Sequence, residues 1–325
     1  MIEERGIPIT VVTGFLGAGK TTLVNALLAA APRGEIAVIV NEHGAVGIDA
    51  ALLAARVETI VEIAGGCVCC STRAELARAL ESFARSPSPP ARILVETSGA
   101  ASPAGVLHVV RGSERARGTF LDGVVTVVDA SRMETLAEHE LAVEQIGYAD
   151  IVVASRADLC DDTARARARD AIEACNGAAF VTSAARGAFE DPSLTSLDAL
   201  LARRGADLEP ARAAWGATAP AAHPYESVAL VHEGDVDGER FADFVETEVA
   251  RFSGRLFRTK GILAVDGIAE RMIVQGVADD AEISFGEPWG DVRRRSTFVV
   301  VGYGLDRASL ERAFAACHAT TPSRA

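Results

Sequence analysis

The stretch ITVVTGFLGAGKTT at residues 9–22 decides the fold of this 325-residue chain. The β-branched run Ile9–Thr13 predicts a buried strand, and an Ala- and Leu-rich helical pattern begins at Thr21. Between them, Gly14–Thr21 matches the pattern G-x-x-x-x-G-K-[ST]. A strand, a glycine-rich loop and a helix in this order are typical of a phosphate-binding loop.

The residue types in this loop suit a nucleotide phosphate. The backbone N–H groups and the helix N-terminus attract its negative charge. Lys20 adds a cation for the β- and γ-phosphates, and the Thr21 hydroxyl is a ligand for Mg²⁺. The flanking elements disfavour the alternative of a glycine-rich turn without chemistry, as does Lys20 being one of only two lysines among 32 basic residues. The expected nucleotide contacts are Gly14, Gly17, Ala18, Gly19, Lys20, Thr21 and Thr22.

Short β-branched runs and helical patterns alternate from this stretch to about residue 203. The expected strands are Ile7–Thr13, Ile36–Val40, Thr59–Ile63, Ile93–Glu96, Gly123–Asp129, Ile151–Ala154 and Ala179–Thr182. The expected helices include Thr21–Ala31, Arg73–Ala84, Glu138–Tyr148 and Thr163–Cys175. Continuously apolar strands separated by helices predict a mostly parallel sheet that is covered on both faces.

The pattern changes after residues 205–224, which are rich in Ala, Pro and Gly and predict a linker. The expected strands beyond it are Ser227–His232, Ile262–Val265, Ile273–Gly276 and Thr297–Gly302, and the expected helices are Gly238–Arg251 and Arg307–Cys317. We therefore expect an α/β P-loop NTPase domain at residues 1–204 and a smaller α+β domain at residues 225–325.

The composition narrows the classes of partner. A formal charge of −13 disfavours nucleic-acid binding, which needs a basic surface. No apolar run approaches the roughly 20 residues of a membrane span. The acidic start MIEER does not have the pattern of a signal peptide. We therefore expect a cytoplasmic protein whose thiols stay reduced.

Two further strand ends carry polar residues that suit a nucleotide. Glu96 ends one strand, where it can hold Mg²⁺ and orient a water, and Gly99 lets the backbone turn toward the γ-phosphate. Another strand runs into Ser155-Arg156-Ala157-Asp158, where GTPases commonly carry Asn-Lys-x-Asp. An Asp158 carboxylate would accept hydrogen bonds from guanine, and the alternative is that it only caps the next helix. Ser183, after a later strand, is a further candidate contact for the base.

Three thiols stand within four residues at Cys67, Cys69 and Cys70, after two glycines. Thiolates bind borderline or soft metals such as Zn²⁺, Co²⁺ and Cu⁺. A redox pair would need a strained disulfide, an iron–sulfur cluster normally needs four thiolates, and three inert thiols would be a coincidence. A tetrahedral site needs one more ligand, and the candidates are His43, Glu42, Glu62, water and a partner protein. Because ligands gather beyond the carboxyl ends of parallel strands, we expect the thiols and the nucleotide at one edge of the sheet.

Together these motifs resemble the CobW family of metal-handling GTPases, which includes zinc-linked metallochaperones and nitrile hydratase activators. The matching segments are Gly14–Thr22, Asn41–Asp49, Gly66–Cys70, Glu96–Gly99, Val127–Ala130, Arg258–Ile262 and Arg294–Ser296. The resemblance implies slow, Mg²⁺-dependent GTP hydrolysis coupled to delivery of zinc or cobalt to a client metalloprotein, and a CobW-type C-terminal domain. It places Asp49 in a nucleotide-responsive switch loop, with Lys20 and Glu96 as the other catalytic residues.

The chain departs from the family in two places that bear on ligands. Ala45 stands where members usually carry a glutamate that is a candidate metal ligand in some of them, and Ser155 and Arg156 replace the usual base-recognition pair. Two alternatives to a GTP-dependent metallochaperone stay open. One is a metal-responsive GTPase that activates a client without transferring metal, and the other is a P-loop kinase for a small molecule. The sequence leaves open whether copies of the chain form a homo-oligomer.

Overall fold

The computed structural model describes residues 6–32, 35–42, 60–64, 70–115, 118–203 and 225–319. The chain divides into two compact units, of which one comprises Met1–Ile172 with Ala179–Arg204 and the other Glu173–Ala178 with Gly205–Ala325. The expected linker at residues 205–224 lies outside the described residues. Among the described helices, none combines the length and the apolar character that a membrane crossing requires.

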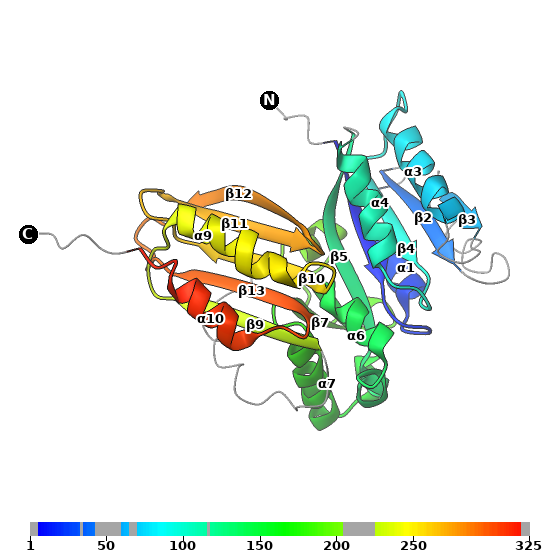
Figure 1. The fold of residues 1–325 in the computed structure, drawn as a ribbon. Helices are drawn as coiled ribbons and strands as arrows, with labels where there is room; N and C mark the ends of the chain where they lie inside the picture. The colour runs from blue at the N-terminus through cyan, green and yellow to red at the C-terminus, as the bar shows by residue number, and fades with distance from the viewer. Residues whose placement is uncertain are drawn as a thin grey trace, which may run out of the picture. The chain divides into compact units, whose positions relative to one another are not determined.

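The first unit is built on one sheet with the strand order β3-β2-β4-β1-β5-β6-β7-β8 (Figure 1). Its strands are β1 Ile7–Thr13, β2 Ile36–Glu42, β3 Ile60–Ala64, β4 Arg92–Thr97, β5 Thr119–Asp129, β6 Ile151–Ser155, β7 Phe180–Ala185 and β8 Ala188–Phe189. Every pair is parallel except β7 with β8. The expected mostly parallel sheet is therefore confirmed.

Helices cover both faces of this sheet, because its central strands are apolar on both sides. The described helices are α1 Lys20–Ala30, α3 Cys70–Ala84, α4 Ala104–Arg115, α5 Met133–Leu136, α6 Glu140–Gly147, α7 Asp162–Cys175 and α8 Leu197–Leu201. Helices α1 and α8 share one core with Val12 and Val38. Figure 1 shows α3 and α4 side by side on the opposite face from α1. Helix α4 was not expected, because its sequence holds two glycines and several valines, which are poor helix formers.

The second unit has an antiparallel sheet with the strand order β12-β11-β10-β13-β9. Its elements are β9 Tyr225–His232, α9 Gly238–Phe244, β10 Leu256–Leu263, β11 Glu270–Val277, β12 Asp280–Pro288, β13 Ser296–Tyr303 and α10 Arg307–Ala315. Phe241 and Phe244 of α9 pack on Phe298 of β13, with ring centroids 5.3 and 5.9 Å from it. This aromatic contact joins the helices to the sheet, and the expected α+β class is confirmed.

Two expected elements of the second unit have different bounds in the structure. The predicted helix Gly238–Arg251 is α-helical only to Phe244 and continues as a π turn, Val245–Val249, and a 3₁₀ turn. The Thr247 hydroxyl donates to the carbonyl of Asp243 at 2.6 Å, a bond that competes with the regular backbone ladder. The predicted strand Ile262–Val265 overlaps only the last two residues of β10, which begins at Leu256 and ends at Leu263.

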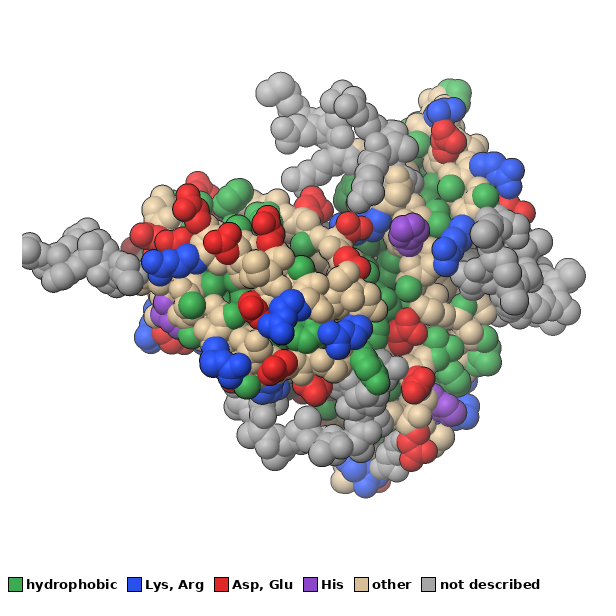
Figure 2. All heavy atoms as spheres, viewed as in Figure 1, with side chains coloured by type: hydrophobic (Ala, Val, Ile, Leu, Met, Phe, Trp, Pro, Cys, Tyr) green, Lys and Arg blue, Asp and Glu red, His purple; other side chains and the backbone are tan. Residues whose placement is uncertain are grey.

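The second unit carries an acidic surface over α9 and β12, as Figure 2 shows. Its exposed acidic residues in these elements are Glu239, Asp243, Asp280, Glu282 and Glu287. An acidic surface of this kind favours positively charged partners.

Candidate nucleotide-binding site

The phosphate-binding loop joins β1 to α1 and turns on three glycines. Gly14, Gly17 and Gly19 have φ values of 137°, 74° and 99°, which favour glycine. A Cβ on Gly14 would lie 2.1 Å from the carbonyl oxygen of Val127, so space also requires glycine there. No side chain among the described residues caps the first turn of α1. The backbone N–H groups of this turn can therefore bind a phosphate.

Lys20 folds back across this loop. Its Nζ donates to the carbonyl oxygens of Gly14 at 2.9 Å and Phe15 at 3.3 Å. The ammonium is thus held over the loop where the phosphates of a nucleotide would lie. An incoming phosphate would offer it a charge-assisted hydrogen bond in exchange for neutral ones.

Thr21 and Glu96, the two residues predicted to hold Mg²⁺, lie in contact although 75 residues separate them along the chain. The Thr21 hydroxyl donates to Glu96 Oε1 at 2.7 Å, and Glu96 is only 4 % exposed. Glu96 reaches this position because Val12 of β1 pairs with it across the sheet. Next to it, the Thr97 hydroxyl lies 2.8 Å from that of Thr13 and ties β4 to β1. A hydroxyl and a carboxylate are hard oxygen donors, so this pair fits Mg²⁺.

Gly99 lies directly against the phosphate-binding loop. A Cβ there would stand 2.8 Å from both the Leu16 nitrogen and Lys20 Nζ. The loop that follows β4 therefore approaches the phosphate site as closely as backbone permits. Any larger residue at position 99 would displace the loop.

Ser155, at the end of β6, contacts the phosphate-binding loop. Its Oγ lies 2.6 Å from the Ala18 carbonyl oxygen and 3.2 Å from that of Val128, so its proton is directed to the closer one. We expected Ser155 to contact the base. The structure shows it fixing the phosphate-binding loop to β6, and its contact with the base stays a prediction.

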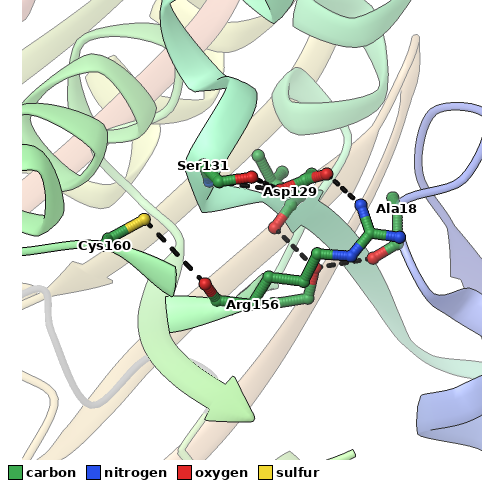
Figure 3. A network of polar contacts seen from close by, with 7 residues as sticks. Ala18, Asp129, Ser131, Arg156 and Cys160 are labelled. Carbon is green, nitrogen blue, oxygen red and sulfur yellow. Dashed lines mark hydrogen bonds and ion pairs between the residues drawn. The ribbon is translucent and has the colours of Figure 1, made fainter. Parts of the chain in front are cut away.

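Arg156 is held by an acid that sequence reasoning did not assign to the site. Its guanidinium forms an ion pair with Asp129, which is buried at the end of β5 (Figure 3). Asp129 also accepts hydrogen bonds from Ser131, at 3.1 Å from its nitrogen and 2.6 Å from its Oγ. The backbone of Arg156 has a φ of 54°. Both backbone and side chain of Arg156 are thus constrained beside the phosphate-binding loop.

Asp158 is exposed in a 3₁₀ turn, Ala157–Leu159, that directly follows Arg156. The alternative assigned it only to capping the next helix. That capping is done by Asp161, which accepts from the Ala164 nitrogen at 2.7 Å near the start of α7. Asp158 therefore keeps its place as a candidate for reading the base.

The loop after β7 returns to the same edge of the sheet. Ser183 pairs with Ala154 of β6, so it lies on the neighbouring strand. A Cβ on Gly187 would lie 3.0 Å from the carbonyl oxygen of Thr22 and from Ala26, which brings this loop onto α1. The ends of β1, β4, β6 and β7 thus surround one site.

The predicted thiol site falls largely outside the described residues. Asp49, Cys67 and Cys69 lie outside them, and Cys70 is described only as the first residue of α3. Within the described ranges, no three His, Cys, Asp or Glu side chains gather to hold a metal ion. Strand β3, which precedes the thiol segment in the chain, is described, and its Ala64 pairs with Glu42 of β2.

Two isolated cysteines, Cys175 and Cys317, are buried. Burial raises the pKa of Cys175 to about 12 and that of Cys317 to about 11. These thiols stay protonated at neutral pH and are poor metal ligands. Cys160 is partly exposed, and burial raises its pKa as well.

Sequence reasoning also missed Gln145, which is fully buried in α6 and donates to the Ala101 carbonyl oxygen at 3.1 Å. Its signal in the sequence is weak, since Glu144 and Gln145 are simply two adjacent polar residues between the apolar Val143 and Ile146. Asp129 lies in a segment that matched the family, but its partner Arg156 could not be identified without the strand order.

The fold and this site define a P-loop nucleotide-binding protein. The model of the CobW/HypB/UreG nucleotide-binding domain matches residues 8–182, and that of the cobalamin synthesis protein cobW C-terminal domain matches residues 225–318. The chain belongs to the CobW/HypB/UreG family.

Several relatives match over nearly the full length of the chain. It is 29 % identical to the zinc chaperone YjiA of Escherichia coli over 95 % of this chain and 98 % of that protein. It is 32 % identical to the zinc chaperone CobW of Pseudomonas aeruginosa over 94 % of this chain and 89 % of that protein. The crystal structure of Zn(II)-bound YjiA GTPase from E. coli covers 97 % of this chain and 99 % of that one, with a TM-score of 0.70 and 25 % identity.

Proposed function

We propose that this chain is a slow, Mg²⁺-dependent GTP hydrolase that binds zinc, or cobalt, through Cys67, Cys69 and Cys70 and delivers it to a client metalloprotein. Residues 1–204 form the GTPase domain, residues 205–224 the linker and residues 225–325 the C-terminal domain. We place its activity in the cytoplasm, where the thiols remain reduced. The zinc chaperones and the GTPase among its relatives support this assignment.

The observation that carries the proposal is the contact of Thr21 with Glu96. Glu96 lies on β4, and β2 and β3 follow β4 in the sheet; β3 is the strand that precedes the thiols in the chain. Glu96 is level with Val40 of β2, which is in turn level with Glu62 of β3. Two strand spacings correspond to about 10 Å. The thiol segment starts shortly after the end of β3, so the metal and the γ-phosphate would be near neighbours.

The nucleotide chemistry follows from the residues around the phosphate-binding loop. Lys20 would pair with the β- and γ-phosphates, and the Gly99 N–H would face the γ-phosphate. Thr21 and Glu96 would hold Mg²⁺, which supplies positive charge for the transferred phosphoryl group. Glu96 would also orient the attacking water, and Asp49 would act from the switch loop.

The base would be held by the ends of β6 and β7. The Asp158 carboxylate would accept from the two guanine donors, Arg156 would lie against the ring, and Ser183 would contribute from the neighbouring strand. The ion pair with Asp129 fixes the Arg156 guanidinium in advance of binding. This arrangement favours GTP over ATP through Asp158.

The decisive experiment compares metal content and GTP hydrolysis in reduced protein. Wild type should hold zinc and release phosphate from GTP. Cys69→Ser/Cys70→Ser should lose zinc and still hydrolyse GTP, whereas Lys20→Ala should hold zinc and hydrolyse none. Transfer is tested by adding an apo zinc-finger peptide to the loaded protein with GTP or GDP.

Cys160→Ser is the matched control, because it removes a partly exposed thiol that is not part of the Cys67–Cys70 motif. It should keep both zinc and hydrolysis. Zinc retained by the double cysteine variant would remove the thiol site from the proposal. A wild-type protein that hydrolyses no GTP would overturn the enzyme assignment.

A further inference from the structure

Helix α6 carries two adjacent polar residues whose side chains hold the loop that follows β4. Gln145 Nε2 lies 3.1 Å from the Ala101 carbonyl oxygen and 3.5 Å from that of Gly99. Because both neighbours are acceptors, the amide must present its NH₂ group to them, which fixes the side-chain orientation. The Ser102 hydroxyl donates to Glu144 Oε1 at 2.6 Å.

The loop held in this way is the one that touches the phosphate-binding loop. The Ala101 nitrogen donates to the Ser98 carbonyl oxygen at 3.2 Å, which closes a turn around Gly99. One side of Gly99 lies against Leu16 and Lys20, and its carbonyl faces Gln145. The position of Gly99 is therefore set from both sides.

The same helix also contacts the phosphate-binding loop itself. The ring of His139, which precedes the first residue of α6, stacks on Phe15 with centroids 5.2 Å apart and planes 17° apart. The Thr126 hydroxyl of β5 donates to the Gln145 carbonyl oxygen at 2.7 Å. Helix α6 thus has a fixed place on the sheet and contacts both loops that would meet a triphosphate.

We propose that Gln145 is a positioning residue for the γ-phosphate. Its hydrogen bonds to the Gly99 and Ala101 carbonyl oxygens hold the loop in the position from which the Gly99 N–H can reach the γ-phosphate. The hydrogen bond from Ser102 to Glu144 is a second attachment. This inference rests on the proposed GTPase function. GDP has no γ-phosphate, so a displaced loop weakens the binding of GTP and leaves the binding of GDP unchanged.

The test uses the full chain and Gln145→Met, which has a similar volume and donates no hydrogen bond. Affinities for GDP and for a non-hydrolysable GTP analogue are measured with fluorescent nucleotides, together with kcat and KM for GTP. We expect the analogue to bind about tenfold more weakly and kcat to fall about tenfold, the effect of about one lost hydrogen bond. GDP affinity should stay within about twofold.

Thr126→Val is the matched control. It removes a buried hydrogen bond to the same residue, at its backbone carbonyl, and leaves the loop contacts in place. It should lower the Tm by an amount similar to Gln145→Met and keep the wild-type ratio of GTP to GDP affinity. An equal change of that ratio in both variants would mean that Gln145 is only structural, and would overturn the inference.

Ser102→Ala gives a second reading if Gln145→Met does not fold. It removes the part-buried bond to Glu144 and the bond that Ser102 Oγ accepts from the Ala104 nitrogen. We expect a loss of about threefold in the GTP-to-GDP affinity ratio. An unchanged ratio in the folded loop variants would overturn the inference while the GTPase assignment stands. A wild-type protein that binds no GTP would overturn the proposed function and this inference with it.

Discussion

Lys20 shows at the scale of one residue how the loop is prepared for a nucleotide. Its ammonium bonds the loop carbonyls of Gly14 and Phe15 and can exchange them for phosphate oxygens. Lys20→Ala should therefore weaken GTP and GDP binding by at least about a hundredfold, since hydrogen bonds to charged groups contribute about 1.5–3 kcal/mol each. Titration with fluorescent nucleotides measures this loss.

Arg78→Ala is the control for charge alone, because Arg78 is an exposed cation on α3. Its nucleotide affinities should equal those of wild type. Unchanged affinity in Lys20→Ala would contradict the assignment of the loop.

The Ser155 hydroxyl donates a hydrogen bond to the phosphate-binding loop, so we expect it to affect phosphate binding as well as base binding. Ser155→Ala leaves the Ala18 carbonyl without its donor at 2.6 Å. The loop should then be less well ordered, and GTP and ATP should both bind about fivefold more weakly, the effect of about 1 kcal/mol. Parallel titrations with the two nucleotides check this prediction.

Asp158→Ala provides the contrast at the neighbouring turn. Its carboxylate is exposed and free of the loop contacts that Ser155 makes, so its loss should weaken GTP binding and leave ATP binding unchanged. A Ser155→Ala protein that loses affinity for GTP alone would mean that Ser155 reads the base.

Residue-level prediction succeeded where a motif follows directly from a strand. Thr21 and Glu96 were each predicted as Mg²⁺ ligands at one sheet edge because both follow or end buried strands, and the structure brings them into contact. The Arg156–Asp129 ion pair could not be predicted, because it depends on Asp129 pairing with Ser155 across β5 and β6. Gln145 was missed because its function comes from the loop it touches, which lies 44 residues away in the chain.

At the scale of elements, tertiary packing decides the cases that sequence patterns leave undecided. Strand β12 was not expected, because Ile283 and Phe285 are its only large apolar residues and it ends in Gly286-Glu287-Pro288. It forms because its backbone pairs with β11, with Ile283 opposite Val274. Edge strands of this kind often carry charges that discourage further pairing.

Helix α6 places Glu144 where burial raises its pKa above the ordinary value of 4.5, and the Ser102 hydrogen bond lowers it by less. Folding therefore favours the protonated form. The stability it contributes is present below pH 4.5 and is lost as the pH rises through the raised pKa. Glu144→Gln carries no charge and keeps an acceptor for Ser102. Its free energy of unfolding should therefore rise relative to wild type as the pH increases, which urea unfolding between pH 5 and 8 measures.

Asp191→Asn is a control with the opposite shift. Hydrogen bonds from Ser193 lower the pKa of Asp191 below 3.8, so its ionisation does not change between pH 5 and 8. The difference in stability between this variant and wild type should be constant over that range. A constant difference for Glu144→Gln as well would contradict the raised pKa of Glu144.

At the scale of the whole molecule, the proposal that the nucleotide and metal sites are neighbours rests on the sheet of the first unit. The ladder aligns Glu96 of β4, Val40 of β2 and Glu62 of β3. The segment between β2 and β3 contains Asp49, and the segment after β3 contains the thiols. We therefore propose that a change in the loops around the γ-phosphate has a short path to the metal ligands.

This proximity predicts that zinc affinity depends on the nucleotide. Coupling of about 1–3 kcal/mol corresponds to a factor of about 5–150 between the GTP-analogue and GDP forms. By linkage, zinc must change the ratio of GTP-analogue to GDP affinity by the same factor. Competition with a chromophoric zinc chelator measures the first factor, and nucleotide titration with and without zinc measures the second. Equal zinc affinities in the two nucleotide forms would exclude coupling. Since Cys69→Ser/Cys70→Ser should abolish both factors together, a nucleotide effect that survives in this variant would place the responsive zinc at other residues.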